Sequence, residues 1–245
     1  MRALSDFELL AAWENGHVAA HGLTGPLCLL AAAYPDESVD SLARLSIGRR
    51  DGLLLELREQ LFGSMLVGLC DCVDCHQALE VRLETSSLKV PVYTEITEPL
   101  SLTSDGYQLN FRLPNSIDLM AISGAPSIAS GRIQLLERLM ISCSYHGEPV
   151  SACDLPEATL ELVEDRLGAA DPQGDIQLNL ACVACEKHNR TLFDIASFLW
   201  NELDVWAIRM LREIHELARA YGWSEREIVT MSSWRRRCYL EMLGI

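Results

Sequence analysis

The spacing of hydrophobic residues changes along the chain, and each change marks a different predicted secondary structure. Residues 5–62 carry apolar side chains at helical spacing, most clearly at Leu53, Leu54 and Leu57 in front of Gly63. Apolar residues three and four positions apart indicate the buried face of a helix, and glycine is a typical stop. We therefore predict helices in this region, separated by the turn sequences His21-Gly22, Tyr34-Pro35-Asp36 and Ser46-Ile47-Gly48.

From Met65 to Arg112 the period is two. Apolar and polar residues alternate in 79–83 and again in 107–112, as expected of half-buried strands. Asp105-Gly106 directly precedes the second run, and Asp-Gly beside an alternating run is a strong indication of a hairpin. This region is therefore predicted to be β structure.

The pattern is helical again between Leu113 and Gln173. A helix entry at 113–116 precedes apolar residues at helical spacing, and a second helix is predicted for 156–167 because proline and acidic residues open it. The apolar residues of the first helical pattern are Ile133, Leu135, Leu136, Leu139 and Met140. The alternating segment 176–180 then predicts a short strand.

A long helix is predicted from Asp194, a good N-cap, to about Tyr221. Its apolar residues form one stripe, made of Ile195, Leu199, Leu203, Trp206, Met210, Ile214, Leu217 and Tyr221. The stripe is either part of a core or a docking face for a partner. Gly222 ends the helix, the capping box 224–227 opens a short helix, and another short helix begins near Ser233.

Together these segments predict an α+β fold that is mainly helical. It contains a β unit divided between two parts of the chain, and it ends with the long helix and two short ones. The predicted regions are an N-terminal helical region (1–64), a β unit with a hairpin (65–112), a helical insert (113–173), the second half of the β unit (174–193) and a C-terminal helical region (194–245).

Two Cys-x-x-Cys pairs lie beside the two predicted strand regions, Cys72 with Cys75 and Cys182 with Cys185. Two residues between cysteines allow one tight turn to present both sulfurs to one ion, and structural zinc is typically held by four thiolates. We refer to each Cys-x-x-Cys turn as a knuckle. The two knuckles predict one shared structural zinc ion in a discontinuous zinc ribbon.

The shared site would close a loop of 106 residues, which costs roughly 4 kcal/mol. Zinc binding of roughly 10–16 kcal/mol can outweigh this cost. Cys70 and His76 flank the first knuckle, and either could replace one ligand. The glycine that usually follows the second cysteine of a knuckle is absent, because His76 and Glu186 occupy these positions.

Composition narrows the range of functions. The chain of 245 residues has a net charge of −15, which disfavours coating of duplex nucleic acid and favours solubility or a basic protein partner. The nine cysteines are an odd count, and five of them show no framework spacing: Cys28, Cys70, Cys143, Cys153 and Cys238. Together with a first segment unlike a signal peptide, this indicates the cytoplasm. The longest apolar run, 27–34, is too short to span a membrane.

The C-terminal region is locally basic. Residues 209–238 contain seven arginines and four glutamates. Tryptophan, tyrosine and arginine are enriched in protein interfaces. The predicted partner-binding residues are Tyr221, Trp223, Trp234, Arg235, Arg236 and Arg237. Phosphate-binding loops, Gly-x-Ser-x-Gly and His-Glu-x-x-His are absent from the sequence, so neither an enzyme nor a small-molecule substrate is expected.

Several blocks occur in an order that resembles one known family. They are Leu45–Gly63, the two knuckles, Phe111–Leu119, Phe193–Leu203 and Leu217–Ile228. Nearly end to end, the chain resembles the T-even-phage-type baseplate hub assembly chaperones or baseplate proteins of contractile phage tails and contractile injection systems. The resemblance implies a non-enzymatic role in building or forming a baseplate.

Two functional hypotheses follow. In the first, a zinc-stapled assembly protein made in the cytoplasm binds baseplate, hub or spike subunits, and the sequence leaves open whether it remains in the finished phage-tail-like particle. In the second, the zinc ribbon and a helix-turn-helix within 217–243 form a DNA-binding regulator, with Arg235 to Arg237 at a groove. The overall acidity disfavours the second hypothesis.

Overall fold

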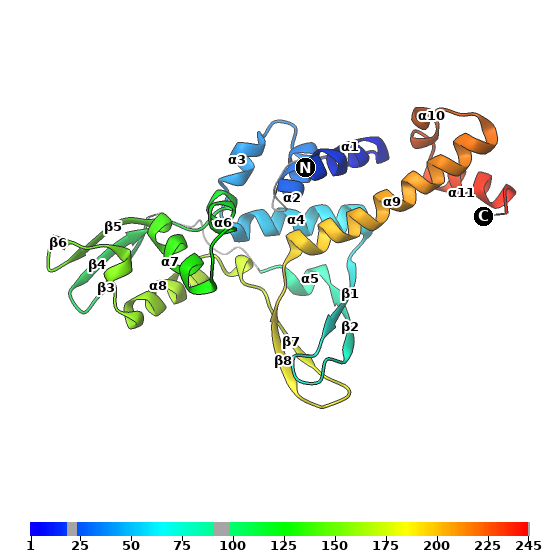
Figure 1. Ribbon diagram of the computed structural model, residues 1–245. Coiled ribbons are helices and arrows are strands. Elements are labelled where there is room, and N and C mark those ends of the chain that lie inside the picture. The colour runs from blue at the N-terminus through cyan, green and yellow to red at the C-terminus, as the bar shows by residue number, and fades with distance from the viewer. Residues whose placement is uncertain (19–23, 91–98, 245) are drawn as a thin grey trace. The chain divides into compact units, whose positions relative to one another are not determined.

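The computed structural model describes residues 1–18, 24–90 and 99–244 (Figure 1). The chain divides into two compact units, Met1–Val39 with Ile195–Ile245 (unit 1) and Asp40–Asp194 (unit 2). The predicted α+β class, mainly helical with a long C-terminal helix, is confirmed. The predicted turn at His21-Gly22 lies outside the described residues.

Unit 1 is built around the long helix α9, Ile195–Tyr221. Its other helices are α1 (Asp6–Val18), α2 (Thr24–Ala33), α10 (Glu225–Val229) and α11 (Ser233–Met242). The apolar stripe of α9 is buried: Met210, Ile214 and Leu217 share a core with side chains of α1 and α10. Most of the stripe is therefore core and not a docking face. Of the residues in the stripe, only Tyr221 at its end is exposed.

Small residues set the packing of α1 and α2 in unit 1. The ring of Trp200 lies so close to Gly16 and Gly25 that a Cβ added at Gly16 would be 2.2 Å from Trp200 Cη2. Trp13 Nε1 donates to Asp204 Oδ1 at 2.7 Å and ties α1 to α9. Because glycine has no Cβ, the Trp200 ring fits against the backbones of α1 and α2 at these two positions.

Unit 2 begins near α3 (Val39–Ala43) and contains α4, Ile47–Phe62. Its remaining helices are α5 (Thr85–Leu88), α6 (Ser116–Ile122), α7 (Ile128–Leu139) and α8 (Glu157–Ala170), with short 3₁₀ turns η1 (Ala152–Asp154) and η2 (Pro172–Gly174). Its strands are β1 (Met65–Asp71), β2 (Ala78–Glu84), β3 (Leu100–Ser104), β4 (Tyr107–Phe111), β5 (Met140–Tyr145), β6 (Glu148–Pro149), β7 (Gln177–Ala181) and β8 (His188–Leu192).

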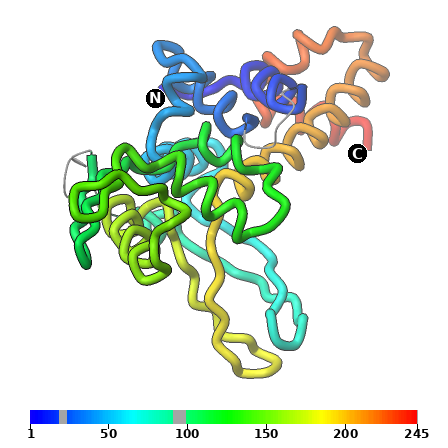
Figure 2. The backbone as a smooth tube through the Cα atoms, turned by 60° about the vertical axis from the view of Figure 1, so that its left-hand side comes forward, coloured from blue at the N-terminus to red at the C-terminus, as the bar shows by residue number. Residues whose placement is uncertain are grey.

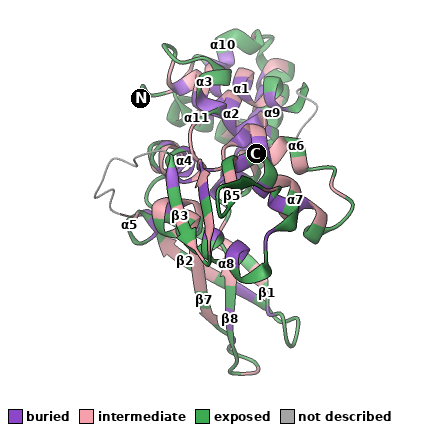
Figure 3. Ribbon diagram, turned by 90° about the vertical axis from the view of Figure 1, so that its left-hand side faces the viewer, coloured by how far each residue is buried: buried purple, intermediate pink, exposed green. Residues whose placement is uncertain are grey.

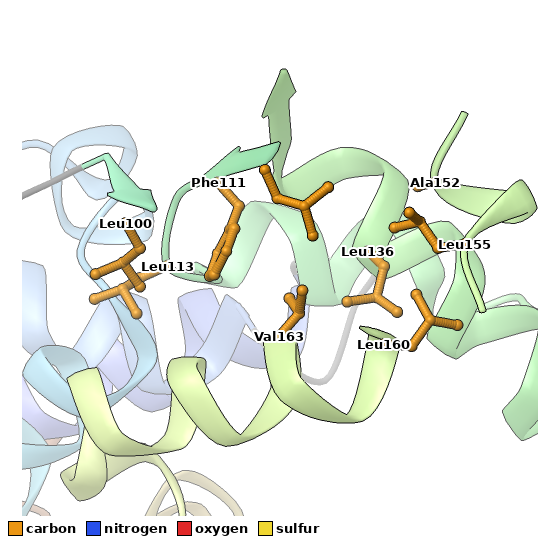
Figure 4. Packing of buried hydrophobic residues seen from close by; sticks show 9 residues of the cluster. Leu100, Phe111, Leu113, Leu136, Ala152, Leu155, Leu160 and Val163 are labelled. Carbon is orange, nitrogen blue, oxygen red and sulfur yellow. The ribbon is translucent and has the colours of Figure 1, made fainter. Parts of the chain in front are cut away.

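Strands β3, β4, β5 and β6 form one antiparallel sheet in that order. The predicted Asp105-Gly106 turn joins β3 to β4, and both of its residues have positive φ (48° and 84°), as a two-residue hairpin turn of this kind requires. Helices α7 and α8 cover one face, where Phe111, Leu136 and Val163 meet in a buried cluster (Figure 4).

The interpretation of Met140 as part of a helical pattern is wrong. Met140 begins β5, which pairs with β4 and aligns Cys143 with Leu109. This pairing joins residues 29 to 38 positions apart. Whether a segment forms a strand depends on its neighbouring strands, and local periodicity carries no information about them. The segment 113–173 therefore contributes two strands as well as helices.

Polar contacts bring together the two chain segments that lead into the knuckles. Asp171 Oδ2 accepts a hydrogen bond from the Gly48 backbone N–H at 2.7 Å, which joins η2 to the start of α4. Gln173 donates to the Leu88 carbonyl at 3.0 Å and accepts from the Val90 N–H at 2.6 Å. Because α4 leads into β1 and η2 leads into β7, these bonds place the two hairpins near each other.

Candidate metal centre

The two knuckles lie at the tips of two separate hairpins, β1–β2 and β7–β8. Both views of the backbone place the two tips close to each other at one end of unit 2 (Figures 1 and 2). The turns have the same hydrogen bonds: Cys72 N–H donates to the Gln77 carbonyl and Cys182 N–H to the Lys187 carbonyl, each at 2.9 Å. The prediction that the first knuckle belongs to a β unit is confirmed.

The four predicted cysteine sulfurs come together. Cys72 Sγ lies 3.7 Å from Cys185 Sγ, Cys75 Sγ lies 3.6 Å from Cys182 Sγ, and all four sulfurs lie within 4.8 Å of one another. Four sulfurs at about 2.3 Å from a tetrahedral zinc ion stand about 3.8 Å apart. The donor set and its spacing therefore fit one ion bound by four thiolates.

Backbone donors favour the thiolate form of the first cysteine of each knuckle. The N–H groups of Cys75 and Asp74, followed by the side chain of Asn189, lower the pKa of Cys72 to about 6, even though burial opposes the charge. The N–H groups of Cys185 and Ala184 likewise lower the pKa of Cys182. Both residues are buried.

The pKa of the second cysteine of each knuckle shifts in the opposite direction, upward. The Gln77 N–H lowers the pKa of Cys75, but desolvation and the three neighbouring sulfurs raise it to about 12. The Lys187 N–H lowers the pKa of Cys185, while desolvation and Cys182 raise it. Four thiolates at this distance repel one another unless a cation lies between them, so the geometry suits a metal ion.

Two side chains that sequence reasoning missed support the sulfurs. Asn189 is buried and donates through Nδ2 to Cys72 Sγ at 3.3 Å. Lys187 Nζ pairs with Asp74 Oδ1 at 2.5 Å and links the two knuckles. In the first hairpin the position equivalent to Asn189 is Leu79, so comparison of the two Cys-x-x-Cys segments could have identified an unusual buried amide. Donors to metal ligands orient them and tune the metal.

The two alternative ligands do not join the cluster. Among residues 1–18, 24–90 and 99–244, the group of close donor atoms consists of Cys72, Cys75, Cys182 and Cys185. Cys70 lies on β1 two residues before Cys72 and is half-buried, and burial raises the pKa of its thiol. His76 is exposed in the turn.

The residues that replace the usual glycines adopt the glycine conformation. His76 has φ 57° and Glu186 has φ 59°, in the left-handed region. This conformation closes the knuckle, since the N–H of each residue returns to the carbonyl of the first cysteine at 2.9 Å. A side chain there costs about 1–2 kcal/mol relative to the right-handed region.

Glu186→Gly is therefore expected to stabilise unit 2 by about 0.5–1 kcal/mol, because the relief of left-handed strain exceeds the entropy gained by the unfolded chain. Urea unfolding of the metal-loaded protein measures this change. Glu161→Gly on the exposed face of α8 is the matched control and should destabilise by about 1 kcal/mol. A loss of stability in Glu186→Gly would contradict the proposed role of backbone strain at the knuckle.

The predicted partner-binding residues differ in their surroundings. Tyr221 stacks on Trp223 with ring centroids 4.5 Å apart, and Tyr239 packs edge-on against both. Trp234 is 75% exposed. Arg235 and Arg237 are also exposed, and the Arg235 guanidinium lies 5.8 Å from the Tyr239 ring centroid.

Arg236 is a correction to this set. Its side chain is only 2% exposed, and it pairs with Asp6 Oδ2 at 2.7 Å and Glu213 Oε2 at 3.3 Å. It also donates to the Met231 carbonyl at 2.6 Å. Because these bonds anchor α11 to α1 and α9, Arg236 serves the core of unit 1 and does not face a partner.

Within the part of the chain that the structure describes, no helix has the length and apolar character needed to cross a bilayer. A family model described as T4 bacteriophage base plate protein matches residues 28–200. The match covers more than two thirds of the sequence and includes both knuckles. Comparisons with curated proteins and with solved structures give no match.

Proposed function

The chain belongs to the T4 bacteriophage base plate protein family, and from this premise we propose that it is a zinc-stapled, non-enzymatic subunit or assembly factor of a contractile particle's baseplate. The family match over residues 28–200 is the observation that carries the proposal. The proposed partners are other baseplate, hub or spike proteins. The proposed thiolate site requires reduced cysteines, which suits synthesis in the cytoplasm before assembly.

We assign zinc to the four-cysteine site on chemical grounds. Soft thiolates select zinc, copper(I) or iron–sulfur clusters, and a closed set of four thiolates in two knuckles is typical of structural zinc. Such a site has no open position for water or substrate, which supports a structural role. The ion would join hairpins that belong to segments 106 residues apart.

The proposed docking face is the exposed side of α11. Trp234 and Met242 are 75% and 74% exposed, and Arg235 and Arg237 flank this apolar surface. Exposed tryptophan beside arginine is the composition of interface hot spots. Tyr221 and Trp223 border the face, although their mutual stacking gives them a second role within unit 1.

Replacing Trp234 by alanine together with Arg235→Glu and Arg237→Glu tests this face. The substituted side chains are exposed, so folding should be retained, while loss of a tryptophan hot spot is expected to weaken partner binding by a factor of about 30 or more. Complementation of a deletion strain, with contractile particles counted by electron microscopy, measures the effect. Arg209→Glu on the exposed surface of α9 is the control for charge reversal.

A normal yield of particles from the triple variant would show that the partner binds to another surface. A normal yield from the deletion strain itself would contradict the baseplate role.

The DNA-binding alternative has less support. Phosphate binding by three consecutive arginines requires exposed side chains, but Arg236 is buried and paired with two carboxylates. Trp234, which precedes these arginines in the sequence, is exposed. An exposed tryptophan suits a protein interface better than a groove of duplex DNA.

A further inference from the structure

Strand β1 has an exposed apolar row. Burial alternates along its seven residues, and the side chains of Met65, Val67 and Leu69 are 46%, 50% and 78% exposed. Leu66, between them, is buried. Figure 3 shows the strands of both hairpins as mainly exposed or half-buried. One face of β1 is therefore an apolar surface that unit 2 leaves in water.

The same residues turn their backbone toward an unpaired edge. The hairpin contains only β1 and β2, and among the described residues no other strand pairs with β1. At its two ends, Cys72 N–H donates to Gln77 and Thr85 N–H donates to Ser64. Hydrogen-bonded and non-hydrogen-bonded pairs alternate in an antiparallel ladder, so the even-numbered residues of β1 bond to β2. The odd-numbered residues direct their N–H and C=O groups away from β2.

The usual protection of an edge strand is missing. Natural edges are often protected by lysine, proline or a bulge. The sequence Met-Leu-Val-Gly-Leu-Cys-Asp of β1 contains no lysine or proline, and its pairing with β2 is continuous from Met65 to Asp71. An apolar row and an open hydrogen-bonding edge thus coincide on one strand.

We propose that β1 pairs edge to edge with β1 of a second copy of this chain. In the antiparallel register centred on Gly68, Val67 lies opposite Leu69 of the second copy, and Met65 lies opposite Asp71. The odd-numbered residues of both strands then exchange backbone hydrogen bonds. The two hairpins become one four-stranded sheet with the order β2, β1, β1 and β2.

The chemistry of the row favours a second copy as the occupant. In this register the central pairs are apolar with apolar, and Asp71, the only charged residue of β1, meets methionine instead of a like charge. The contact is small, because it comprises one short strand from each copy, so the association is weak. The net charge of −15 per chain also opposes association, and salt reduces this repulsion.

Sedimentation of the full metal-loaded chain over a range of concentrations tests the proposal. We expect a monomer at about 5 µM, a substantial dimer fraction at about 500 µM, and a dimer that strengthens at higher salt. Amide hydrogen exchange gives a readout at single residues. The N–H groups of Val67 and Leu69 should be protected only at the high concentration, whereas those of Leu66 and Cys70 should be protected at both.

Val67→Pro is the sharpest variant. It removes an N–H that points away from β2, so the hairpin keeps its own ladder while the outer edge loses a donor. Leu69→Lys places a charge in the apolar row and is the second variant. Both are expected to remain monomeric at about 500 µM with unchanged metal content. Ile128→Lys, at a 93% exposed position on α7, is the matched control and should dimerise like the wild type.

A wild type that remains monomeric across this range would overturn the proposal. Dimers formed equally by Val67→Pro and Leu69→Lys would overturn it as well, since another surface would then carry the contact. If the wild type is monomeric but Val67→Pro loses binding to a purified baseplate subunit, the edge serves a different protein and the second copy is the wrong occupant. The sedimentation and hydrogen-exchange results do not depend on the proposed baseplate role.

Discussion

Cys182→Ser is expected to abolish stable zinc binding and to unfold the two knuckles. Its sulfur lies 3.6 Å from that of Cys75 and is one of the four that surround the proposed ion. A serine hydroxyl does not replace a thiolate ligand, and structural zinc contributes roughly 10–16 kcal/mol of binding free energy that becomes folding free energy. We expect the metal content to fall below about 0.1 equivalent and the melting temperature to fall by ~10 °C or more.

The controls lie in the same segment. Cys70→Ser and His76→Ala should keep about one equivalent of metal, because neither side chain belongs to the four-sulfur group. Full metal content and unchanged thermal stability in Cys182→Ser would refute a shared site. Loss of the metal in Cys70→Ser but not in Cys72→Ser would require a different ligand set.

Arg236→Ala is expected to lower the free energy of unfolding by about 3 kcal/mol, near the lower limit for breaking a buried ion pair. The guanidinium is buried, but its partners Asp6 and Glu213 have side chains that are 35% and 25% exposed, so water can solvate the carboxylates that remain. The loss of its bond to the Met231 carbonyl adds to the cost. Denaturant unfolding measures the change.

Arg237→Ala is the matched control, since the neighbouring side chain is exposed and its removal should change stability by less than about 0.5 kcal/mol. Equal unfolding midpoints for the wild type and Arg236→Ala would contradict the anchoring role. The same pair of variants separates stability from recognition, because only the exposed arginines belong to the proposed docking face.

Local patterns predicted the elements whose causes are local. The α9 helix begins and ends where its apolar stripe, Asp194 and Gly222 indicated, and the capping box at Ser224 is present. The paired knuckles were predictable because each turn is encoded within four residues and repeated. The resemblance to baseplate proteins is confirmed by the family match, although the hub chaperone subtype stays a prediction.

Features that depend on distant residues were not predictable in this way. Strand β5 exists because β4 pairs with it across α6 and α7, and its own sequence resembles the end of a helix pattern. Arg236 looked like one of three surface arginines, but Asp6 lies 230 positions earlier and draws it into the core. The division into two units likewise depends on the packing of α9 against α1 and α2. That the five predicted regions act as folding units stays a prediction.

We propose that two knuckles 106 residues apart bind one zinc ion through four thiolates. X-ray absorption spectroscopy of the purified full-length protein, combined with elemental analysis, tests it most directly. We expect about one zinc per chain with four sulfur neighbours at about 2.3 Å. Absence of a bound metal, or a first shell that contains nitrogen or oxygen in place of one or more sulfurs, would contradict it.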